Sequence, residues 1–236
     1  MKLKDILTPT FKDYCQAPTS IVVVSTDSDF CRETVARRWL TEEQMAHAAE
    51  RYQLGRSRSG KCIFWMIDEL GFVHDGHIGN AWASDMLKNR EPVLLKHWYA
   101  THCLFGLHLL QSESSVSSHI CIVESEASAV VLSELFPESL WMATVNPLHL
   151  DIRYFEPLRG HDLMLFPPTD ETMSTYVSWL EVADQLRRLY FSSPQDRGSI
   201  TVNPILEDHA TASQKARHID LLAFLEEGNE EVDSSK

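Results

Sequence analysis

The chain has 236 residues, of which 34 are acidic and 21 are basic, so its formal net charge at pH 7 is −13. This charge argues against a protein that wraps nucleic acid non-specifically. The composition is 44% hydrophobic and 23% charged, which is typical of a globular protein with one large domain or two small ones. The sequence contains no apolar stretch of membrane-spanning length and no secretory signal, so we expect a cytoplasmic protein without a membrane partner.

The cysteines and histidines give little sign of a metal site. The five cysteines are widely spaced and form no CxxC pair, which disfavours a disulfide framework or a zinc ribbon. We predict that they are reduced and mostly buried. The pairs His74–His77 and His97–His102 have spacings found among metal ligands, but residues i and i+3 of a strand point to opposite faces. We therefore favour no histidine metal site.

The N-terminal residues 1–100 predict a mixed α+β subdomain with a β-hairpin. The run Ile21–Val24 fits either a buried strand or an extended arm. The capping-box pattern Thr41–Gln44 predicts a helix that ends by Gly55. An apolar run at 62–67, a turn at 68–71 and a second apolar pair then predict the hairpin.

From residue 103, short apolar runs alternate with amphipathic stretches, which is typical of an α/β layer. Strands are predicted at 119–124, 140–144, 162–166 and 199–202, and helices at 127–136, 171–190 and 219–225. Residues 101–228 therefore predict a parallel sheet flanked by helices. The acidic tail 229–236 is predicted to be disordered.

Carboxylates follow two of these predicted strands. Glu124 ends the first strand, with Glu126 beside it, and Asp170 and Glu171 follow the third. The carboxyl ends of parallel strands gather functional groups, and carboxylates there can hold Mg²⁺. Alternatively, the same side chains stabilise the N-termini of the helices that follow them. Spacing alone favours this second interpretation.

A resemblance to a known family changes that balance. The segment 122–129, followed by Trp141–Ala143 and Leu165–Pro167, resembles the toprim fold of bacterial primases and topoisomerases. In particular, the chain is similar to a toprim-like family of unknown function from bacterial genomes and mobile elements. Further segments fit that family's pattern in order, namely 51–55, 63–68, 71–76, Trp98 with His102, and 104–110. The resemblance extends from about Tyr52 to Leu225.

The resemblance implies a role for each acidic residue at this edge. In the toprim family, the acidic residue that ends the first strand acts as general acid or base in phosphoryl transfer, which implies a catalytic role for Glu124. An Asp-x-Asp pair after a later strand binds Mg²⁺. In this chain, Glu126 and Asp170 would be the metal ligands.

Three departures from the family pattern predict a degenerate site. Pro168 replaces an aspartate, and it has neither a carboxylate nor a backbone donor. Ala127 replaces a lysine and so removes a charge that pairs with phosphate. Val145 replaces a glycine-rich segment and closes the room in which a backbone could approach a phosphate.

Two clusters of basic residues are candidate nucleic-acid contacts. Arg56, Arg58 and Lys61 precede the hairpin, and Arg90 and Lys96 lie near Trp98. Such groups can neutralise phosphates and stack on single-stranded bases, although basic residues beside strands are usually solvated surface.

Two functional hypotheses follow from the sequence. The first is a primase-related protein of DNA replication or mobile-element maintenance, with a degenerate site and a DNA-binding or accessory role. Its partner would be single-stranded or duplex DNA, or a replication protein. The alternative is an active Mg²⁺-dependent nucleotidyl or phosphoryl transferase that uses Glu124.

Overall fold

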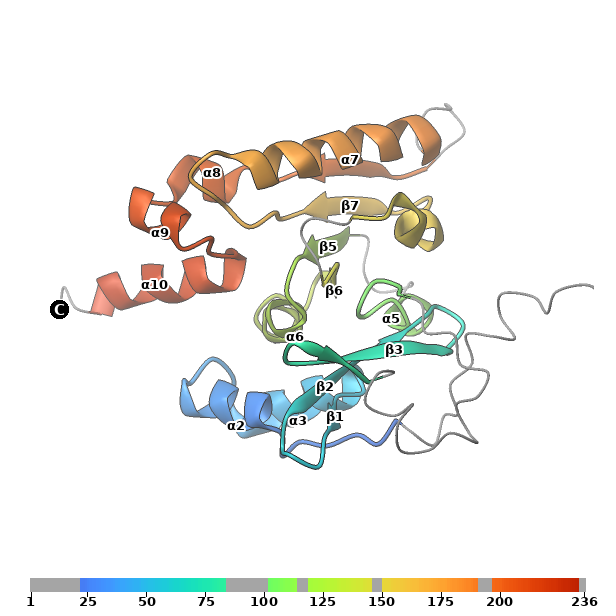
Figure 1. The fold of residues 1–236 in the computed structure, drawn as a ribbon, viewed down its shortest axis with the longest axis vertical. Helices are drawn as coiled ribbons and strands as arrows, with labels where there is room; N and C mark the ends of the chain where they lie inside the picture. The colour runs from blue at the N-terminus through green and yellow to red at the C-terminus, as the bar shows by residue number, and fades with distance from the viewer. Residues whose placement is uncertain (1–21, 84–101, 114–118, 146–149, 191–196, 234–236) are drawn as a thin grey trace, which may run out of the picture.

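Two four-stranded sheets organise the molecule (Figure 1). The computed structural model describes residues 22–83, 102–113, 119–145, 150–190 and 197–233. The first sheet is antiparallel with the order β1-β2-β3-β4, and the second is parallel with the order β6-β5-β7-β8. The structure confirms the predicted α/β class and the parallel sheet flanked by helices.

The antiparallel sheet follows two helices. The elements are α2 (Asp29–Ala36), α3 (Glu42–Arg51), β1 (Gly55–Arg56), β2 (Cys62–Ile67), β3 (Val73–Ile78) and β4 (Ala81–Trp82). The capping box at Thr41 and Gln44 begins α3, and β2 and β3 form the predicted hairpin. Helix α2 was not predicted, although Ser28 begins it by accepting a hydrogen bond from the backbone N–H of Cys31.

The described residues of the Ile21–Val24 run form an extended arm. Val24 makes an isolated antiparallel bridge to Gly55, which places it beside the end of the first sheet. Val23 is 67% exposed and Val24 is 41% exposed, so the run does not form a buried strand. Ile21 itself lies outside the described residues.

The C-terminal part contains the parallel sheet and its helices. The elements are α5 (Leu109–Glu113), β5 (His119–Val123), α6 (Glu126–Leu135), β6 (Leu140–Ala143), η3 (Ile152–Leu158), β7 (Asp162–Leu165), α7 (Ser174–Tyr190), β8 (Ser199–Val202), α8 (Ile205–His209), α9 (Ala212–Ala216) and α10 (Leu221–Asp233). Helix α6 packs against β5, β6, α3 and α10, and α7 packs against β8 and η3. Helix α10 continues beyond the predicted end at Leu225 and through residues 229–233, which we had expected to be a disordered tail.

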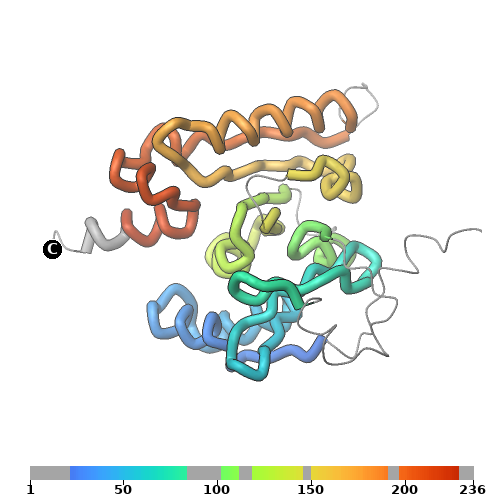
Figure 2. Tube along the Cα trace, viewed as in Figure 1, coloured from blue at the N-terminus to red at the C-terminus, as the bar shows by residue number. Residues whose placement is uncertain are grey.

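The larger of two hydrophobic clusters includes buried residues of both sheets, and a smaller one lies within the antiparallel sheet. Figure 2 shows the path of the chain through these two parts. Tyr52 follows α3 and is fully buried; its hydroxyl donates to the backbone oxygen of Trp141 in β6 at 2.8 Å, and its ring stacks on Phe105. Phe105 in turn exchanges two backbone hydrogen bonds with Ala143. The segment between the two sheets is therefore tied to the edge of the parallel sheet.

The four cysteines of the described part are buried and free, as predicted; Cys15 lies outside it. Within the same residues, no helix has the length and apolar character needed to cross a membrane.

Candidate functional site

The candidate site lies at the carboxyl ends of β5 and β6. These strands pair in parallel register, with Val123 opposite Ala143, so the next residues, Glu124 and Thr144, leave the sheet side by side. The backbone N–H of Val145 donates to the carbonyl of Glu124 at 2.9 Å, which holds the two exits together. The sequence predicted this placement of Glu124.

Glu124 is half-buried, and its carboxyl has a raised pKa. Burial raises the pKa of its carboxyl to about 7, and the negative charges of Asp220 and Glu126 add to the effect. Asp220 was missed in the sequence because it lies almost a hundred residues away. It immediately precedes α10, where its Oδ1 accepts the N–H of Ala223 at 3.0 Å, and its Oδ2 accepts the hydroxyl of Ser128. A carboxyl with a pKa near 7 can exchange a proton at neutral pH.

Glu126 lies in the first turn of α6 and is 6% exposed. Its Oε1 is 2.6 Å from Nδ1 of His77, which belongs to β3 of the antiparallel sheet. The hydrogen bond from Glu126 raises the pKa of His77, and burial of the ring opposes this shift. An imidazole is thus bound to one carboxylate oxygen of Glu126, and the contact links β3 of the antiparallel sheet to the helix that follows β5.

Asp170 follows β7 but is directed into the start of α7. It is 2% exposed and accepts hydrogen bonds from three backbone N–H groups and two hydroxyls of Thr172, Ser174 and Thr175. Although burial opposes the shift, these donors hold the pKa of Asp170 far below its usual range. Both carboxylate oxygens are therefore engaged in capping the helix, as the alternative interpretation of the sequence proposed.

The position where the family pattern has an aspartate offers no carboxylate to a metal ion. Pro168 is buried, and the next residue, Thr169, donates its backbone N–H to Ile219 and its hydroxyl to Glu207 at 2.7 Å. Glu207 is in turn paired with Lys215 at 2.8 Å. The chain that leaves β7 therefore packs against the C-terminal helices.

These residues do not fit a Mg²⁺ site. Among the side chains that the structure describes, no three of His, Cys, Asp and Glu gather as ligands for one metal ion. The structure brings Glu124 and Glu126 together, but an oxygen of Glu126 is bound by His77 and Asp170 is turned into its helix. Carboxylate oxygens that already accept short hydrogen bonds are poorly available to a hard cation.

The predicted basic contacts are largely paired with acidic residues. Arg56 donates from Nε to the backbone oxygen of Asp27 at 2.8 Å, and Nζ of Lys61 is 2.9 Å from Oδ2 of Asp29. Arg58 is exposed. The second predicted cluster, Arg90 and Lys96, lies outside the described residues. The first cluster is thus less positive than its sequence suggests.

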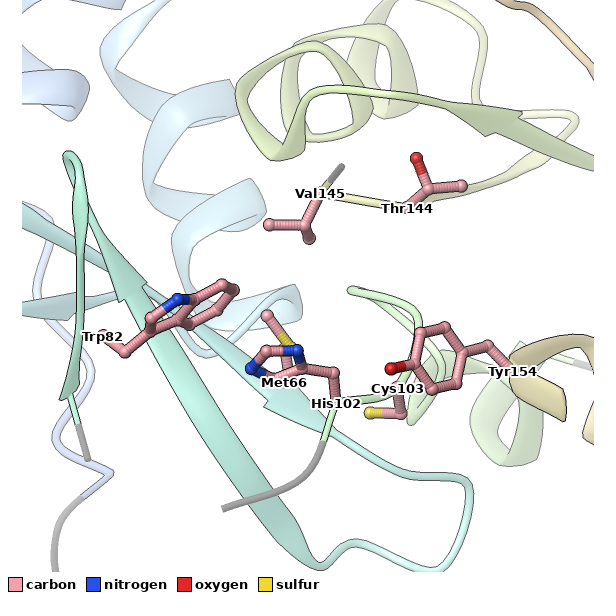
Figure 3. A pocket seen from close by; sticks show the side chains of 7 residues that line it. All are labelled: Met66, Trp82, His102, Cys103, Thr144, Val145 and Tyr154. Carbon is pink, nitrogen blue, oxygen red and sulfur yellow. The ribbon is translucent and has the colours of Figure 1, made fainter. Parts of the chain in front are cut away.

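A pocket of about 350 Å³ opens beside this edge (Figure 3). Its lining comes from both sheets and from the segment between them, and consists of Met66, Trp82, His102, Cys103, Thr144, Val145 and Tyr154. Val145 has a φ of 67°, a left-handed conformation that is rare for a β-branched residue. Strain of this kind costs on the order of 1–3 kcal/mol and is concentrated at functional sites.

The chain is similar in structure to two solved primase structures. The chain is similar to a solved structure entitled "Structure of the DnaG catalytic core", with a TM-score of 0.52 and 11% identity over 87% of this chain and 78% of that one. It is also similar to the "DnaG primase catalytic domain bound to ssDNA", with a TM-score of 0.47 and 12% identity over 82% and 74% of the two chains. At these identities the first likeness establishes a shared fold.

Sequence comparison adds the family. No curated protein matches the chain. A family model described as "Domain of unknown function (DUF6371)" matches residues 33–169, which is more than half of the chain and includes the hairpin, β5, α6, β6 and β7. The chain therefore belongs to the DUF6371 family.

Proposed function

We propose that this chain is a primase-related, toprim-like protein with a degenerate catalytic site, and that it serves DNA replication or mobile-element maintenance by binding DNA or a replication protein. The observation that supports the proposal most strongly is the lack of a free carboxylate where the chain leaves β7. There, Pro168 provides no carboxylate, and the oxygens of Asp170 accept five hydrogen bonds from the start of α7.

The loss of a second free carboxylate matters because metal-assisted phosphoryl transfer needs oxygen ligands that converge on the ion. Glu124 alone does not provide them. With a pKa of about 7 it is about half protonated at neutral pH, and a protonated carboxyl is a poor ligand for Mg²⁺. These properties of the site support a protein that has kept the fold without the catalytic activity more strongly than they support an active transferase.

The proposed DNA contacts are Arg56, Arg58 and Lys61, together with Arg90 and Lys96. Two of these already pair with Asp27 and Asp29, and the whole chain has a net charge of −13. Each phosphate contact would therefore compete with a neighbouring acidic group. We expect modest affinity that falls as salt rises, without a requirement for Mg²⁺.

The test combines binding and activity. Anisotropy of fluorescent single-stranded and duplex DNA is measured across a salt series, with and without Mg²⁺, and primer synthesis is assayed on a single-stranded template. We expect salt-dependent binding that Mg²⁺ does not strengthen, and no primer. Absence of binding at low salt would contradict the DNA-binding role and leave a replication protein as the partner to test.

The alternative is an active transferase, and the raised pKa of Glu124 is the observation that favours it. It predicts Mg²⁺-dependent primer synthesis that Glu124→Gln abolishes. The matched control is Glu138→Gln, which changes an exposed residue near the opposite end of α6. Synthesis that both variants retain would show that Glu124 is not the acid or base.

A further inference from the structure

The pocket in Figure 3 has walls from segments far apart in sequence. Trp82 of β4 and His102 form one side, and Tyr154 of η3 lies on the other, with its hydroxyl directed toward the interior. Val145 closes the side nearest the carboxyl end of β6. A volume of about 350 Å³ is at the lower end of the range for small-ligand pockets and suits one ring system.

Two aromatic rings form one wall of this space. The rings of His102 and Trp82 are stacked with centroids 4.2 Å apart, and the ring of His77 is tilted against Trp82 at 5.0 Å. Both His102 and Trp82 line the pocket, with Tyr154 on the other side. Planar ligands bind such platforms because their faces are attracted to aromatic rings.

The charges of the described lining favour an uncharged ligand. None of the seven described lining residues is a lysine or arginine. Oδ2 of the buried Asp75 is 4.0 Å from Nε2 of His102, and Glu126 is bound to His77, which contacts Trp82. Burial lowers the pKa of His102, which favours the neutral form of its ring. An uncharged ring with polar edges therefore suits the described walls better than a phosphate.

The backbone at Val145 is a second, independent sign of a binding site. Its φ of 67° is held by the hydrogen bond from its N–H to Glu124, and its side chain faces the pocket. A β-branched residue adopts this conformation only where the surroundings enforce it. Val145, the residue with the strained backbone, is therefore also part of the pocket wall.

We propose that this pocket binds a single nucleobase of a single-stranded nucleic acid. The base stacks on the His102–Trp82 pair, and the hydroxyl of Tyr154 meets its polar edge. The sugar and phosphate remain outside, away from Asp75 and Glu126. This inference rests on the proposed function. It adds to the proposed DNA binding a contact with the base itself, besides the contacts with phosphates.

The first experiment separates base from phosphate. Binding of a fluorescent thymidine oligomer is compared by anisotropy with that of an abasic oligomer of the same length and charge. We expect the thymidine oligomer to bind about tenfold more tightly, and Trp82→Leu to remove this difference without changing the abasic affinity. Equal binding of the two oligomers by the wild-type protein would overturn the proposal and leave the DNA-binding role intact.

The second experiment uses free thymidine, which carries no phosphate. We expect it to quench tryptophan fluorescence in the wild-type protein, and to leave the Trp82→Leu variant unaffected. Quenching by thymidine without binding of either oligomer would overturn the proposal, because the pocket would then accept a free nucleoside and not a base of a nucleic acid, and it would also contradict the DNA-binding role. Failure of thymidine and of both oligomers would overturn both.

Two further variants guard against a folding artefact. Phe136→Leu removes a partly exposed ring at the opposite end of α6 and β6, and we expect it to retain the preference for bases. Tyr154→Phe keeps the aromatic wall and removes the hydroxyl, so we expect an intermediate loss. If Trp82→Leu lowers the unfolding temperature, His102→Leu provides the same test from the other ring. A preference for bases that survives both Trp82→Leu and His102→Leu would overturn the proposal.

Discussion

Glu124 and Asp170 both follow buried strands of the same sheet, and their surroundings have opposite effects on them. Glu124 is half-buried beside two other acidic groups, and the pKa of its carboxyl is raised to about 7. Asp170 is almost fully buried, yet five donated hydrogen bonds hold its pKa far below the usual range. The donors around a carboxylate, more than its position after a strand, decide whether it can exchange a proton or only caps a helix.

The largest effect is expected for Asp170→Ala. Its loss leaves three backbone N–H groups at the start of α7 without their acceptor, so we expect the free energy of unfolding to fall by about 2–3 kcal/mol. Urea unfolding measures the change, and the matched control Asp184→Ala removes an exposed carboxylate of α7 at a cost of less than about 0.5 kcal/mol. Equal costs for the two variants would show that Asp170 is not the cap.

A smaller loss is expected for His77→Ala. The change leaves the carboxylate of Glu126, which is 6% exposed, without its imidazole partner, and we expect a cost of about 1–2 kcal/mol. Because the pKa of His77 is raised in the folded state, this stabilisation is fully present below the pKa of the unfolded residue and is lost as pH rises through the folded value.

The control for this variant is a second histidine whose glutamate partner also lies on α6. His47 is paired with Glu134 near the other end of α6 at 2.7 Å, but its ring is 66% exposed. We expect His47→Ala to cost less than about 1 kcal/mol. If the two histidine variants lower the free energy of unfolding by the same amount, the pair between the sheets has no special role.

Glu124→Gln tests the raised pKa of Glu124, in contrast to the lowered pKa of Asp170. In wild type, the folded state keeps a proton between about pH 4.5 and 7 that the unfolded state has lost, so stability falls as pH rises through this window. Glutamine stays neutral, and we expect the variant to be more stable than wild type by about 1 kcal/mol above the window and equal to it below. Urea unfolding at both ends of the window measures this; a gain that is the same at every pH would contradict the raised pKa.

The smallest effect is expected for Asp220→Asn. Asparagine also caps helices well, so α10 is retained, while removal of the negative charge lowers the pKa of Glu124 by less than about one unit. Carboxyl chemical shifts of Glu124 followed against pH measure the change. The control Asp184→Asn leaves that titration unchanged, and a matching shift there would show that net charge alone is responsible.

Much of the scaffold was predictable because its local signals agree. The capping box at Thr41 and the apolar runs of β5, β6 and β7 lie close to their predicted positions. Helix α2 was missed because it has only eight residues and no capping box, and its start depends on the side chain of Ser28.

The site was less predictable than the scaffold. Glu124 was found because it directly follows a strand. Asp220 was not, since only the packing of α10 on α6 brings it there. The capping role of Asp170 was one of the two interpretations of the sequence, and the Thr and Ser residues that follow it supply donors of its cap. The partner of Glu126 came from β3 in the other sheet, a contact that no spacing along the chain records.

The hydrogen bond from Tyr52 to Trp141 also bears on how the molecule folds. The larger hydrophobic cluster joins the two sheets through Tyr52, Phe105 and Ala143. We therefore expect residues 1–100 and 101–228 to melt in one cooperative transition, and either piece expressed separately to expose an apolar face and aggregate. On this expectation, the two sheets differ in architecture but fold together.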